Sequence, residues 1–141
     1  MTATILGTSG VLAAIDSDQR HYETAFRVLS RLAGRRVLSP FVLAELDYLV
    51  GEKLGQAAQV ALLDEVARGA YQLAPFSSDD VSDAIEVIER YADFGVGLAD
   101  ASNVVLSRKY ETNDILTLDE RHFRTLRGYR DRPFRILPAD A

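Results

Sequence analysis

The sequence predicts an α/β fold with a mainly parallel sheet. Short apolar runs alternate with longer segments of helical pattern along the 141 residues, and this alternation is typical of strand–helix–strand units. The chain has no internal repeat, low-complexity stretch or linker rich in Pro, Gly and Ser. Since ordinary domains hold roughly 100–200 residues, we expect one domain over residues 1–141.

The first half of the chain is predicted to hold three strands and four helices. Ala3–Leu6 is an apolar run that ends at a Gly-Thr-Ser-Gly turn, as a buried strand would. Ser39 and Pro40 are the residue types of a helix N-cap and a first helical position. The other expected elements are helices beginning at Val11 and spanning His21–Leu32, Pro40–Leu54 and Gln56–Ala67, with strands at Val37–Leu38 and Ala70–Phe76.

The second half continues the alternation. Ser78 opens a helix in which Val81, Ile85 and Ile88 recur at i, i+4 and i+7, and this spacing predicts one apolar face. A rather apolar helix follows and is expected to be central. The expected elements are helices over Gly97–Tyr110 and Glu120–Leu126 and strands at Ile115–Leu118 and Phe134–Leu137.

Composition excludes several classes of protein. With 16 basic and 21 acidic residues the net charge is −5, which argues against a simple electrostatic nucleic-acid binder but not against a metal-dependent nuclease. The charge is uneven, because residues 108–135 hold eight basic and five acidic residues, a net of +3. The absence of Cys excludes disulfides, zinc–thiolate sites and thiol nucleophiles. Without an apolar run of ~18 residues or a signal-peptide pattern, we expect a cytoplasmic protein and no membrane segment.

Three carboxylates differ from the acids of solvated helix faces. Glu45 lies in PFVLAELDYLV, where it is either a carboxylate within an apolar face or an exposed residue of a half-buried helix. Asp100 is the one charge in GVGLADASNVVL, and it either faces a site or interacts with the positive end of its helix. Asp119 directly follows ILTL, so it either projects with Thr117 from the sheet edge or caps the next helix.

These acids and two strand ends can converge on one pocket. The first strand ends at Gly7-Thr8-Ser9, and ligand sites in parallel sheets form beyond the carboxyl ends of strands. Two carboxylates ~4 Å apart repel by about 4 kcal/mol at an effective dielectric constant of about 20. A divalent cation would relieve this repulsion, and Mg²⁺ prefers oxygen ligands. Such a site can activate water and stabilise the leaving oxygen in phosphodiester cleavage.

The order of these motifs resembles the PIN-domain ribonucleases, and within them the VapC toxins of bacterial type II toxin–antitoxin systems. The matching pieces are ILGTSGVLAAID, SPFVLAELDYLV, GVGLADASNVVLSRKY and ILTLDERHF, which span nearly the whole chain in family order. The resemblance implies a PIN-like α/β/α sandwich whose central, mostly parallel sheet has about four or five strands. It also implies an endoribonuclease with an acidic pocket for Mg²⁺ or Mn²⁺.

The resemblance assigns roles to individual residues. Glu45, Asp100 and Asp119 match the catalytic acids, and Asp100 and Asp119 would also hold the metal. Thr8, Ser9 and Thr117 match hydroxyl residues that accompany them. Five further residues are candidates from position alone: Asn103 as an outer-shell or substrate contact, and Arg121, His122, Arg124 and Arg127 as contacts to RNA phosphates.

One position departs from the family pattern. The family has a metal-ligand Asp immediately before the Thr-Ser pair, and this chain has Gly7 there. Glycine has no side chain and cannot ligate, so we expect weakened metal binding and little cleavage. Two explanations are open: a toxin inactivated deliberately, with Asp in the coding gene, or a naturally degenerate member that only binds an antitoxin or RNA.

The resemblance also implies partners. A cognate VapB-like antitoxin would lay its C-terminal segment against the apolar helices around Tyr48 and Leu63 and place an Arg in the acidic pocket. A homodimer and a structured RNA substrate, tRNA or rRNA, are implied in the same way. A phosphoacceptor receiver domain is disfavoured, because the first strand ends in Gly-Thr-Ser and no Lys follows Lys109. Nucleotide-cofactor folds have no support, since the chain lacks a P-loop and a GxGxxG motif.

Overall fold

A five-stranded, entirely parallel sheet forms the centre of the molecule. The computed structural model describes residues 2–141 and contains β1 (Ala3–Leu6), β2 (Arg35–Leu38), β3 (Gln72–Leu73), β4 (Asp114–Leu116) and β5 (Arg135–Leu137). The strand order is β3-β2-β1-β4-β5, and every pairing is parallel. The expected α/β fold with a mainly parallel sheet is therefore confirmed.

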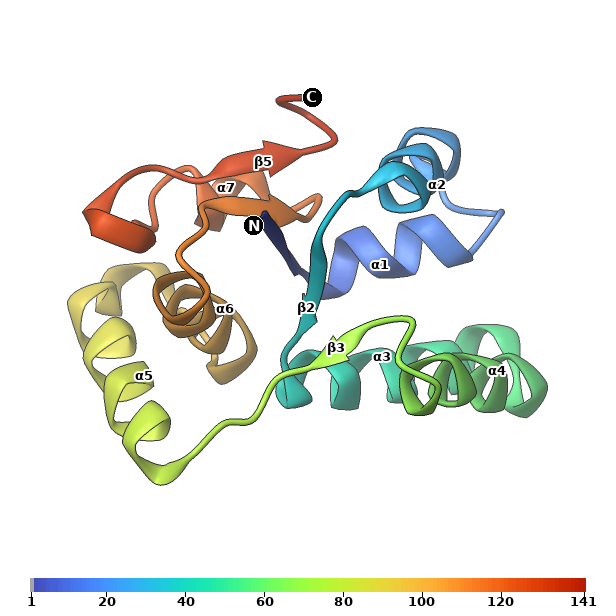
Figure 1. Ribbon diagram of the computed structural model, residues 1–141, viewed down its shortest axis with the longest axis horizontal. Helices are drawn as coiled ribbons and strands as arrows, with labels where there is room; N and C mark the ends of the chain where they lie inside the picture. Colours follow the sequence, from blue (N-terminus) through green and yellow to red (C-terminus); the bar gives the residue numbers. More distant parts are fainter. Residues whose placement is uncertain (1) are drawn as a thin grey trace.

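Helices cover both faces of the sheet (Figure 1). One apolar core joins the sheet to a first helical layer, and a second core joins it to the other layer. The first layer comprises α1 (Thr8–Ile15), α2 (Tyr22–Arg31), α3 (Pro40–Leu54) and α4 (Gln56–Ala67). The second contains α5 (Ser78–Arg90) and α6 (Leu98–Lys109), and short elements complete the chain: α7 (Glu120–Phe123) and the 3-10 turns η1 (Ala92–Phe94) and η2 (Tyr129–Asp131).

Most expected elements are present: β1 has the expected bounds, β2 is longer than expected, and β3, β4 and β5 are shorter. The strand expected at Ala70–Phe76 reduces to two exposed residues, because it lies at the sheet edge and pairs only with β2. The first helix begins at Thr8 and not at Val11, so the chain turns from β1 into α1 without a connecting loop. Among residues 2–141, none of the helices has both the length and the apolar character that a membrane crossing requires.

The expected apolar face of α5 is wrong for Val81 and Ile85, whereas Ile88 does pack against the core. Val81 is 39% exposed and Ile85 is 51% exposed, whereas Ala84 and Val87 are buried. Asp80 is buried on this face because its carboxylate accepts the backbone N–H of Ser77 and pairs with Lys109 of α6 at 2.9 Å. The ion pair and the small Ala84 thus set the rotation of α5, which a hydrophobic count alone does not reveal.

The central strands β1 and β4 position the candidate site. They pair in register, Leu6 opposite Leu116, and both end at the same edge of the sheet. The chain order reverses between them, and such a switch point is where parallel sheets open a crevice for ligands. Helix α1 approaches this edge closely, since a Cβ added at Gly10 would lie 2.5 Å from the carbonyl oxygen of Leu116.

Candidate metal centre and active site

An acidic cleft of about 440 Å³ opens at the carboxyl edge of β1 and β4. Three carboxylates from three different elements line it: Glu45 of α3, Asp100 of α6 and Asp119 after β4. Gly7, Thr8, Ser9 and Thr117 line it as well, together with the apolar side chains of Leu12, Tyr48 and Leu49. The structure therefore brings together the acids and hydroxyls that the sequence places at strand ends.

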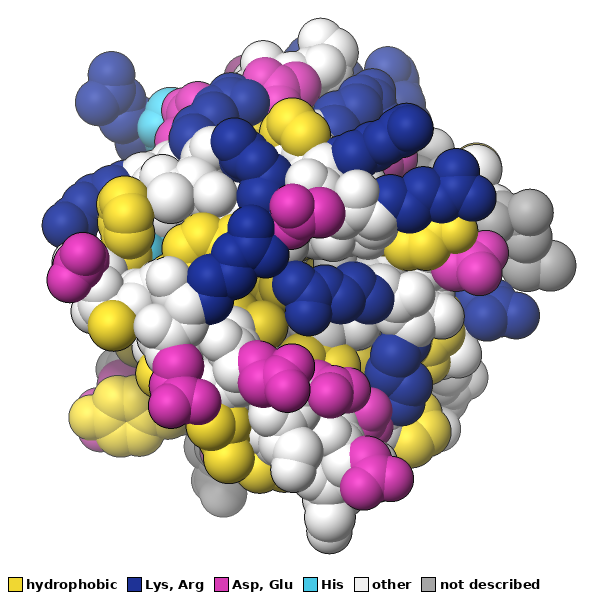
Figure 2. Space-filling model, turned by 90° about the vertical axis from the view of Figure 1, so that its left-hand side faces the viewer, with side chains coloured by type: hydrophobic (Ala, Val, Ile, Leu, Met, Phe, Trp, Pro, Cys, Tyr) yellow, Lys and Arg dark blue, Asp and Glu magenta, His cyan; other side chains and the backbone are white. Residues whose placement is uncertain are grey.

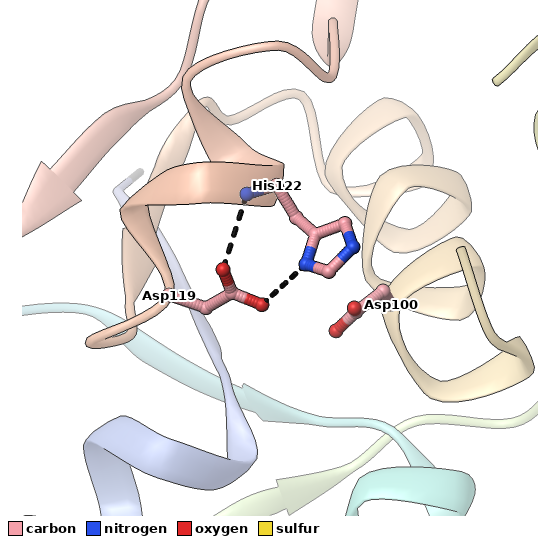
Figure 3. A group of neighbouring side chains, drawn as sticks. All are labelled: Asp100, Asp119 and His122. Carbon is pink, nitrogen blue, oxygen red and sulfur yellow. Dashed lines mark hydrogen bonds and ion pairs between the residues drawn. The ribbon is translucent and has the colours of Figure 1, made fainter. Parts of the chain in front are cut away.

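Asp119 is held by both of its carboxylate oxygens (Figure 3). Oδ1 accepts the backbone N–H of His122 at 3.1 Å and caps α7, while Oδ2 lies 2.7 Å from Nδ1 of the same histidine. The two alternatives for this residue are thus compatible, because Asp119 caps a helix and still lies in the acidic cleft.

Asp100 lies in the first turn of α6 and is half-buried. Burial raises the pKa of its carboxyl to about 6, and the nearby charge of Asp119 and the weaker influence of Glu45 act in the same direction. His122 acts in the opposite direction. Negative charge is therefore concentrated here beyond what the protein's own groups neutralise, which is the condition that favours a bound cation.

His122 is the site residue to which sequence analysis assigned no role in holding the acids. Its Nδ1 faces Asp119 and its Nε2 lies 3.0 Å from the carbonyl oxygen of Phe94. Both neighbours are hydrogen-bond acceptors, so both ring nitrogens are satisfied only when each carries a proton. The contacts with Asp119 and Phe94 accordingly raise the pKa of His122 above its usual value. The signal in the sequence is its i+3 spacing from Asp119.

Glu45 lines the cleft and is an exposed residue of a half-buried helix, which is the second of the two alternatives for it. The hydroxyl of Thr8 donates to its Oε1 across 37 residues of sequence. Because Thr8 is the first residue of α1, this bond ties α3 to the turn after β1. The carboxylate is thereby directed toward the cleft instead of away into solvent.

Two hydroxyls join the strand ends. Oγ of Ser9 accepts the backbone N–H of Leu118 at 2.9 Å and lies 3.1 Å from Oγ1 of Thr117. Oγ1 of Thr117 in turn accepts the backbone N–H of Asp119 at 3.1 Å. These bonds fix the turn that carries Asp119 against the start of α1, so both hydroxyls position the acid.

Asn103 is placed behind the cleft, not in it. The side chain is 1% exposed, and its amide donates to the carbonyl oxygen of Leu6 at 3.3 Å. Its Oδ1 is the one buried side-chain polar atom without a partner within residues 2–141. In this arrangement Asn103 contacts the backbone just before Gly7 and supports the end of β1.

Comparison with known proteins establishes the family. The family model described as PIN domain matches residues 5–128. This chain belongs to the PIN-domain family. Within that family it is 40% identical over 134 residues to Ribonuclease VapC26 from Mycobacterium tuberculosis, an alignment that covers 95% of this chain and 99% of the relative.

Two solved structures share the fold. The crystal structure of VapC20 from Mycobacterium tuberculosis, a sarcin–ricin loop cleaving toxin, matches with a TM-score of 0.77 at 20% identity, covering 84% of this chain and 90% of that one. VapBC2 from Rickettsia felis, bound to a DNA fragment from its promoter, matches with a TM-score of 0.57 at 21% identity, over 86% of this chain and 92% of that one. Both likenesses support the PIN-like α/β sandwich.

Gly7, where the sequence resemblance places the first acid of the family, is tightly packed. The backbone of Gly7 is extended, with φ −91° and ψ 154°, a conformation that any residue adopts. Its N–H donates to the carbonyl oxygen of Leu116 at 2.8 Å. A Cβ at this position would lie 2.9 Å from that oxygen and 3.0 Å from Cβ of Thr117. Any side chain here therefore requires a shift of a few tenths of an ångström between the two strand ends.

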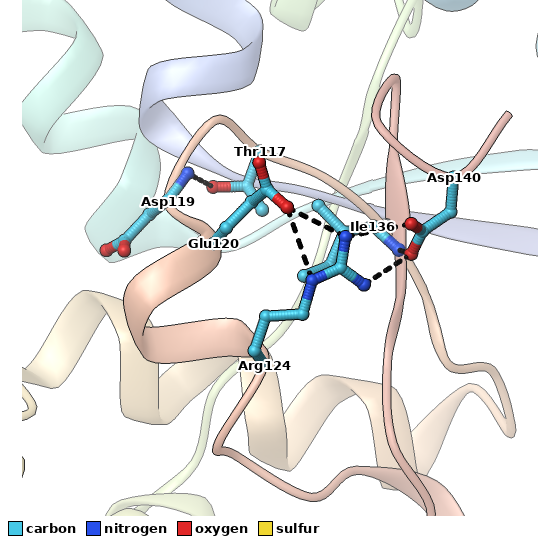
Figure 4. Close-up of polar contacts among 6 residues, drawn as sticks. All are labelled: Thr117, Asp119, Glu120, Arg124, Ile136 and Asp140. Atoms are coloured by element: carbon cyan, nitrogen blue, oxygen red, sulfur yellow. Dashed lines mark hydrogen bonds and ion pairs between the residues drawn. The ribbon is translucent and has the colours of Figure 1, made fainter.

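The basic residues after Asp119 differ in availability. Arg124 pairs with Glu120 and Asp140, both at 2.8 Å, and holds the C-terminal segment against α7 (Figure 4). Arg127 donates to the backbone carbonyl oxygens of Arg124, Thr125 and Leu126. Arg121 is exposed and has no ion-pair partner within residues 2–141. Of these arginines, Arg121 is the one free to contact a ligand.

A basic surface lies at the η2 end of the PIN domain (Figure 2). Lys and Arg side chains gather there above a row of acidic side chains. Arg90 pairs with Asp131 at 2.8 Å, and this bond, with weaker effects of Arg108 and Arg127, lowers the pKa of the Asp131 carboxyl. The excess positive charge of residues 108–135 is partly neutralised elsewhere, by two acids from outside this stretch: Asp80 pairs with Lys109 and Asp140 with Arg124.

The donor set of the acidic cleft fits a divalent cation. Ligand atoms of Asp100, Asp119 and His122 all lie within 4.8 Å of one another. The imidazole already has an acceptor at each nitrogen, which leaves the carboxylates as the donors open to a metal. Oxygen donors suit Mg²⁺ or Mn²⁺ rather than softer metals.

Proposed function

We propose that this VapC-type PIN protein has the architecture of a metal-dependent endoribonuclease that cleaves structured RNA, tRNA or rRNA, as a single domain over residues 1–141. The observation that supports this most is the convergence of Glu45, Asp100 and Asp119 in one cleft beyond β1 and β4. Its 40% identical relative is a ribonuclease, which favours RNA as the substrate class.

The carboxylates have distinct parts in this proposal. Asp100 and Asp119 would hold Mg²⁺ or Mn²⁺, with Glu45 at the opposite wall. When bound, the metal lowers the pKa of a coordinated water and stabilises charge on the phosphate oxygens. His122 holds Asp119 in place, and Thr8 holds Glu45. Arg121 is the free cation beside the cleft that can contact an RNA phosphate.

We propose further that the chain as written is impaired in cleavage. Gly7 contributes no oxygen to the cleft, so a metal there has one protein ligand fewer than the family pattern supplies. If the loss of this ligand lowers the cleavage rate by ~10³-fold, the loss of transition-state stabilisation is about 4 kcal/mol. The same residue favours the second candidate function, a naturally silent module that binds an antitoxin or RNA.

Exposed apolar side chains on α3 and α4 favour an antitoxin as partner. Tyr48 of α3 is 65% exposed, and Val60 and Leu63 of α4 are 56% and 37% exposed. A peptide segment with apolar residues for these helices and an Arg for the acids would complement both surfaces. We propose that a VapB-like antitoxin binds in this way, that the toxin is a homodimer and that both act in the cytoplasm.

Cleavage of RNA tests the proposed activity. Gly7→Asp is expected to cut a structured RNA in the presence of Mg²⁺ or Mn²⁺, and EDTA should stop this cleavage. Its cleavage rate should exceed that of the chain as written by about 10³-fold. Equal activity of the two would refute the impairment. Sequencing the coding gene at codon 7 decides between a deliberate and a natural glycine.

Matched variants connect the activity to the cleft. In the Gly7→Asp background, Asp100→Asn is expected to abolish cleavage, because it removes a proposed metal ligand. Asp93→Asn changes an exposed acid shortly before α6 and is expected to leave cleavage unchanged. If Asp100→Asn retains full activity, the acidic cleft is not the catalytic centre.

A further inference from the structure

A second cleft lies between α2 and β5, apart from the acidic site. Its volume is about 490 Å³, and it shares none of the residues that line the acidic cleft. A smaller third pocket lies between the two, since it shares Thr117 with the acidic cleft and Thr24 and Pro138 with the second cleft. Thr4 of β1 forms part of it, three residues before Gly7, which is ~10 Å along a strand. The proposed nuclease chemistry makes no use of this cleft.

Two arginines of α2 give the cleft a positive charge. Arg27 and Arg31 are four residues apart on one helix, so their side chains lie on the same face, and both line the cleft. Within residues 2–141, no carboxylate lies at ion-pair distance from either. Arg135 also lines the cleft, but it pairs at 3.3 Å with Asp114, the one acidic side chain in the lining of the cleft. Neither arginine of the α2 pair is therefore held in an ion pair within the described residues.

Thr4 adds an unused hydroxyl to this cleft. Its hydroxyl forms no hydrogen bond within the described chain and is not fully enclosed, so it is accessible from the cleft that the residue lines. The hydroxyls of the other two threonines of the cleft are already engaged, since Thr2 donates to the carbonyl of Ala33 and Thr24 to that of His21. A polar group is thus left available for a ligand beside the paired arginines.

We propose that this cleft binds a nucleotide through its phosphate group. Paired guanidinium groups match the geometry of phosphate oxygens, and the hydroxyl of Thr4 can donate to one of them. The apolar wall of Val28, Leu32 and Leu137 suits a base or ribose. The volume is in the usual range of ~300–1,000 Å³ for small-molecule sites. The nucleotide is either free or one unit of an RNA strand.

Calorimetric titration of the full chain in EDTA tests the proposal without metal in the acidic cleft. The probes are AMP, adenosine, inorganic phosphate and a 5′-phosphorylated RNA oligonucleotide. We expect AMP to bind more tightly than adenosine or phosphate alone. Arg27→Gln with Arg31→Gln is expected to weaken AMP about tenfold or more, because charge-assisted bonds are lost. Thr4→Val is expected to weaken it by a smaller factor while circular dichroism stays unchanged.

Arg20→Gln provides the matched control, since Arg20 is exposed in the loop before α2 and does not line the cleft. If the oligonucleotide binds but AMP does not, and the double variant weakens oligonucleotide binding, the cleft is assigned to an RNA strand and the proposal is supported. Equal binding of AMP and adenosine, unchanged binding by the double variant, or no binding of any probe overturns it. Because these titrations measure no cleavage, they stand or fall separately from the nuclease activity.

Discussion

Asp119 and His122 are joined twice, through the backbone N–H that caps α7 and through the imidazole at 2.7 Å. One carboxylate therefore begins a helix and binds the side chain that the helix presents. Since Nε2 of the imidazole is held by the carbonyl of Phe94, the ring cannot rotate without losing a second bond. This pair gives the acidic cleft a fixed wall before any metal is bound.

The first prediction concerns the titration of His122. Its pKa is raised, chiefly by Asp119, so Asp119→Asn is expected to lower it. The folded pKa lies above the unfolded value of ~6.5, so the pair stabilises the fold fully below that pH and the contribution disappears as pH rises through the folded pKa. NMR titration of the imidazole C–H signals measures the shift, and His21 supplies the second set of signals. An unchanged His122 titration in Asp119→Asn contradicts the contact.

The second prediction is that Asp100→Asn stabilises the metal-free protein. The folded pKa of about 6 lies above the model value of 3.8, so the charged carboxylate is disfavoured in the fold. Stability of the chain as written should fall as pH rises from about 4 through about 6, and the variant should avoid this loss. Allowing for partial exposure, we expect a gain of about 1–2 kcal/mol at pH ~7.

Urea unfolding at several pH values measures this difference. The advantage of Asp100→Asn should be small at acidic pH and reach its full size above the pKa of Asp100. Asp93→Asn, which changes an exposed acid, should show no comparable trend. A pH-independent difference would instead point to altered packing of α6.

The third prediction compares two helical glycines. In Gly10→Ala the new Cβ would lie 2.5 Å from the oxygen and 2.6 Å from the carbon of the Leu116 carbonyl, both backbone atoms. Overpacking of this kind costs about 1–3 kcal/mol or more. In Gly51→Ala the nearest atom is the flexible Gln59 Oε1 at 3.4 Å, and alanine raises helix propensity by about 1 kcal/mol. Thermal unfolding should therefore show opposite signs, and a tolerated Gly10→Ala would contradict the close approach of α1 to β4.

The site can be located from the sequence because its residues follow local rules. Apolar runs predict buried strands, and the chain order of a parallel sheet places Thr8, Ser9, Thr117 and Asp119 at one edge. The three acids also lie in short motifs that the family resemblance identifies. What brings these residues together is the sheet topology, and that topology can be read from alternating strands and helices.

The remaining features depend on contacts between distant segments. The rotation of α5 follows from the Asp80–Lys109 pair, which joins residues in separate helices. The role of His122 depends on Phe94, whose backbone approaches from a different part of the chain. Arg124 resembles a free phosphate contact in the sequence, yet it is occupied by Asp140 near the end of the chain. No local pattern encodes these pairings.

The fourth prediction is that Gly7→Asp makes folding stability depend on Mg²⁺. The new Cβ would meet the Leu116 carbonyl at 2.9 Å, and the carboxylate would join Asp100 and Asp119, so both crowding and repulsion should destabilise the metal-free protein. A cation that binds only the folded state restores stability by mass action. Gly7→Asn is the matched control, because it brings the same crowding with no added charge.

Thermal unfolding of both variants, with EDTA and with excess Mg²⁺, measures this response. Gly7→Asp should gain clearly more stability from Mg²⁺ than Gly7→Asn or the chain as written, since it alone completes the set of oxygen ligands. If Gly7→Asp fails to fold in EDTA while the equally crowded Gly7→Asn folds, the failure is attributable to charge and should be relieved by metal. If all three respond equally to Mg²⁺, position 7 is not a ligand position in this protein.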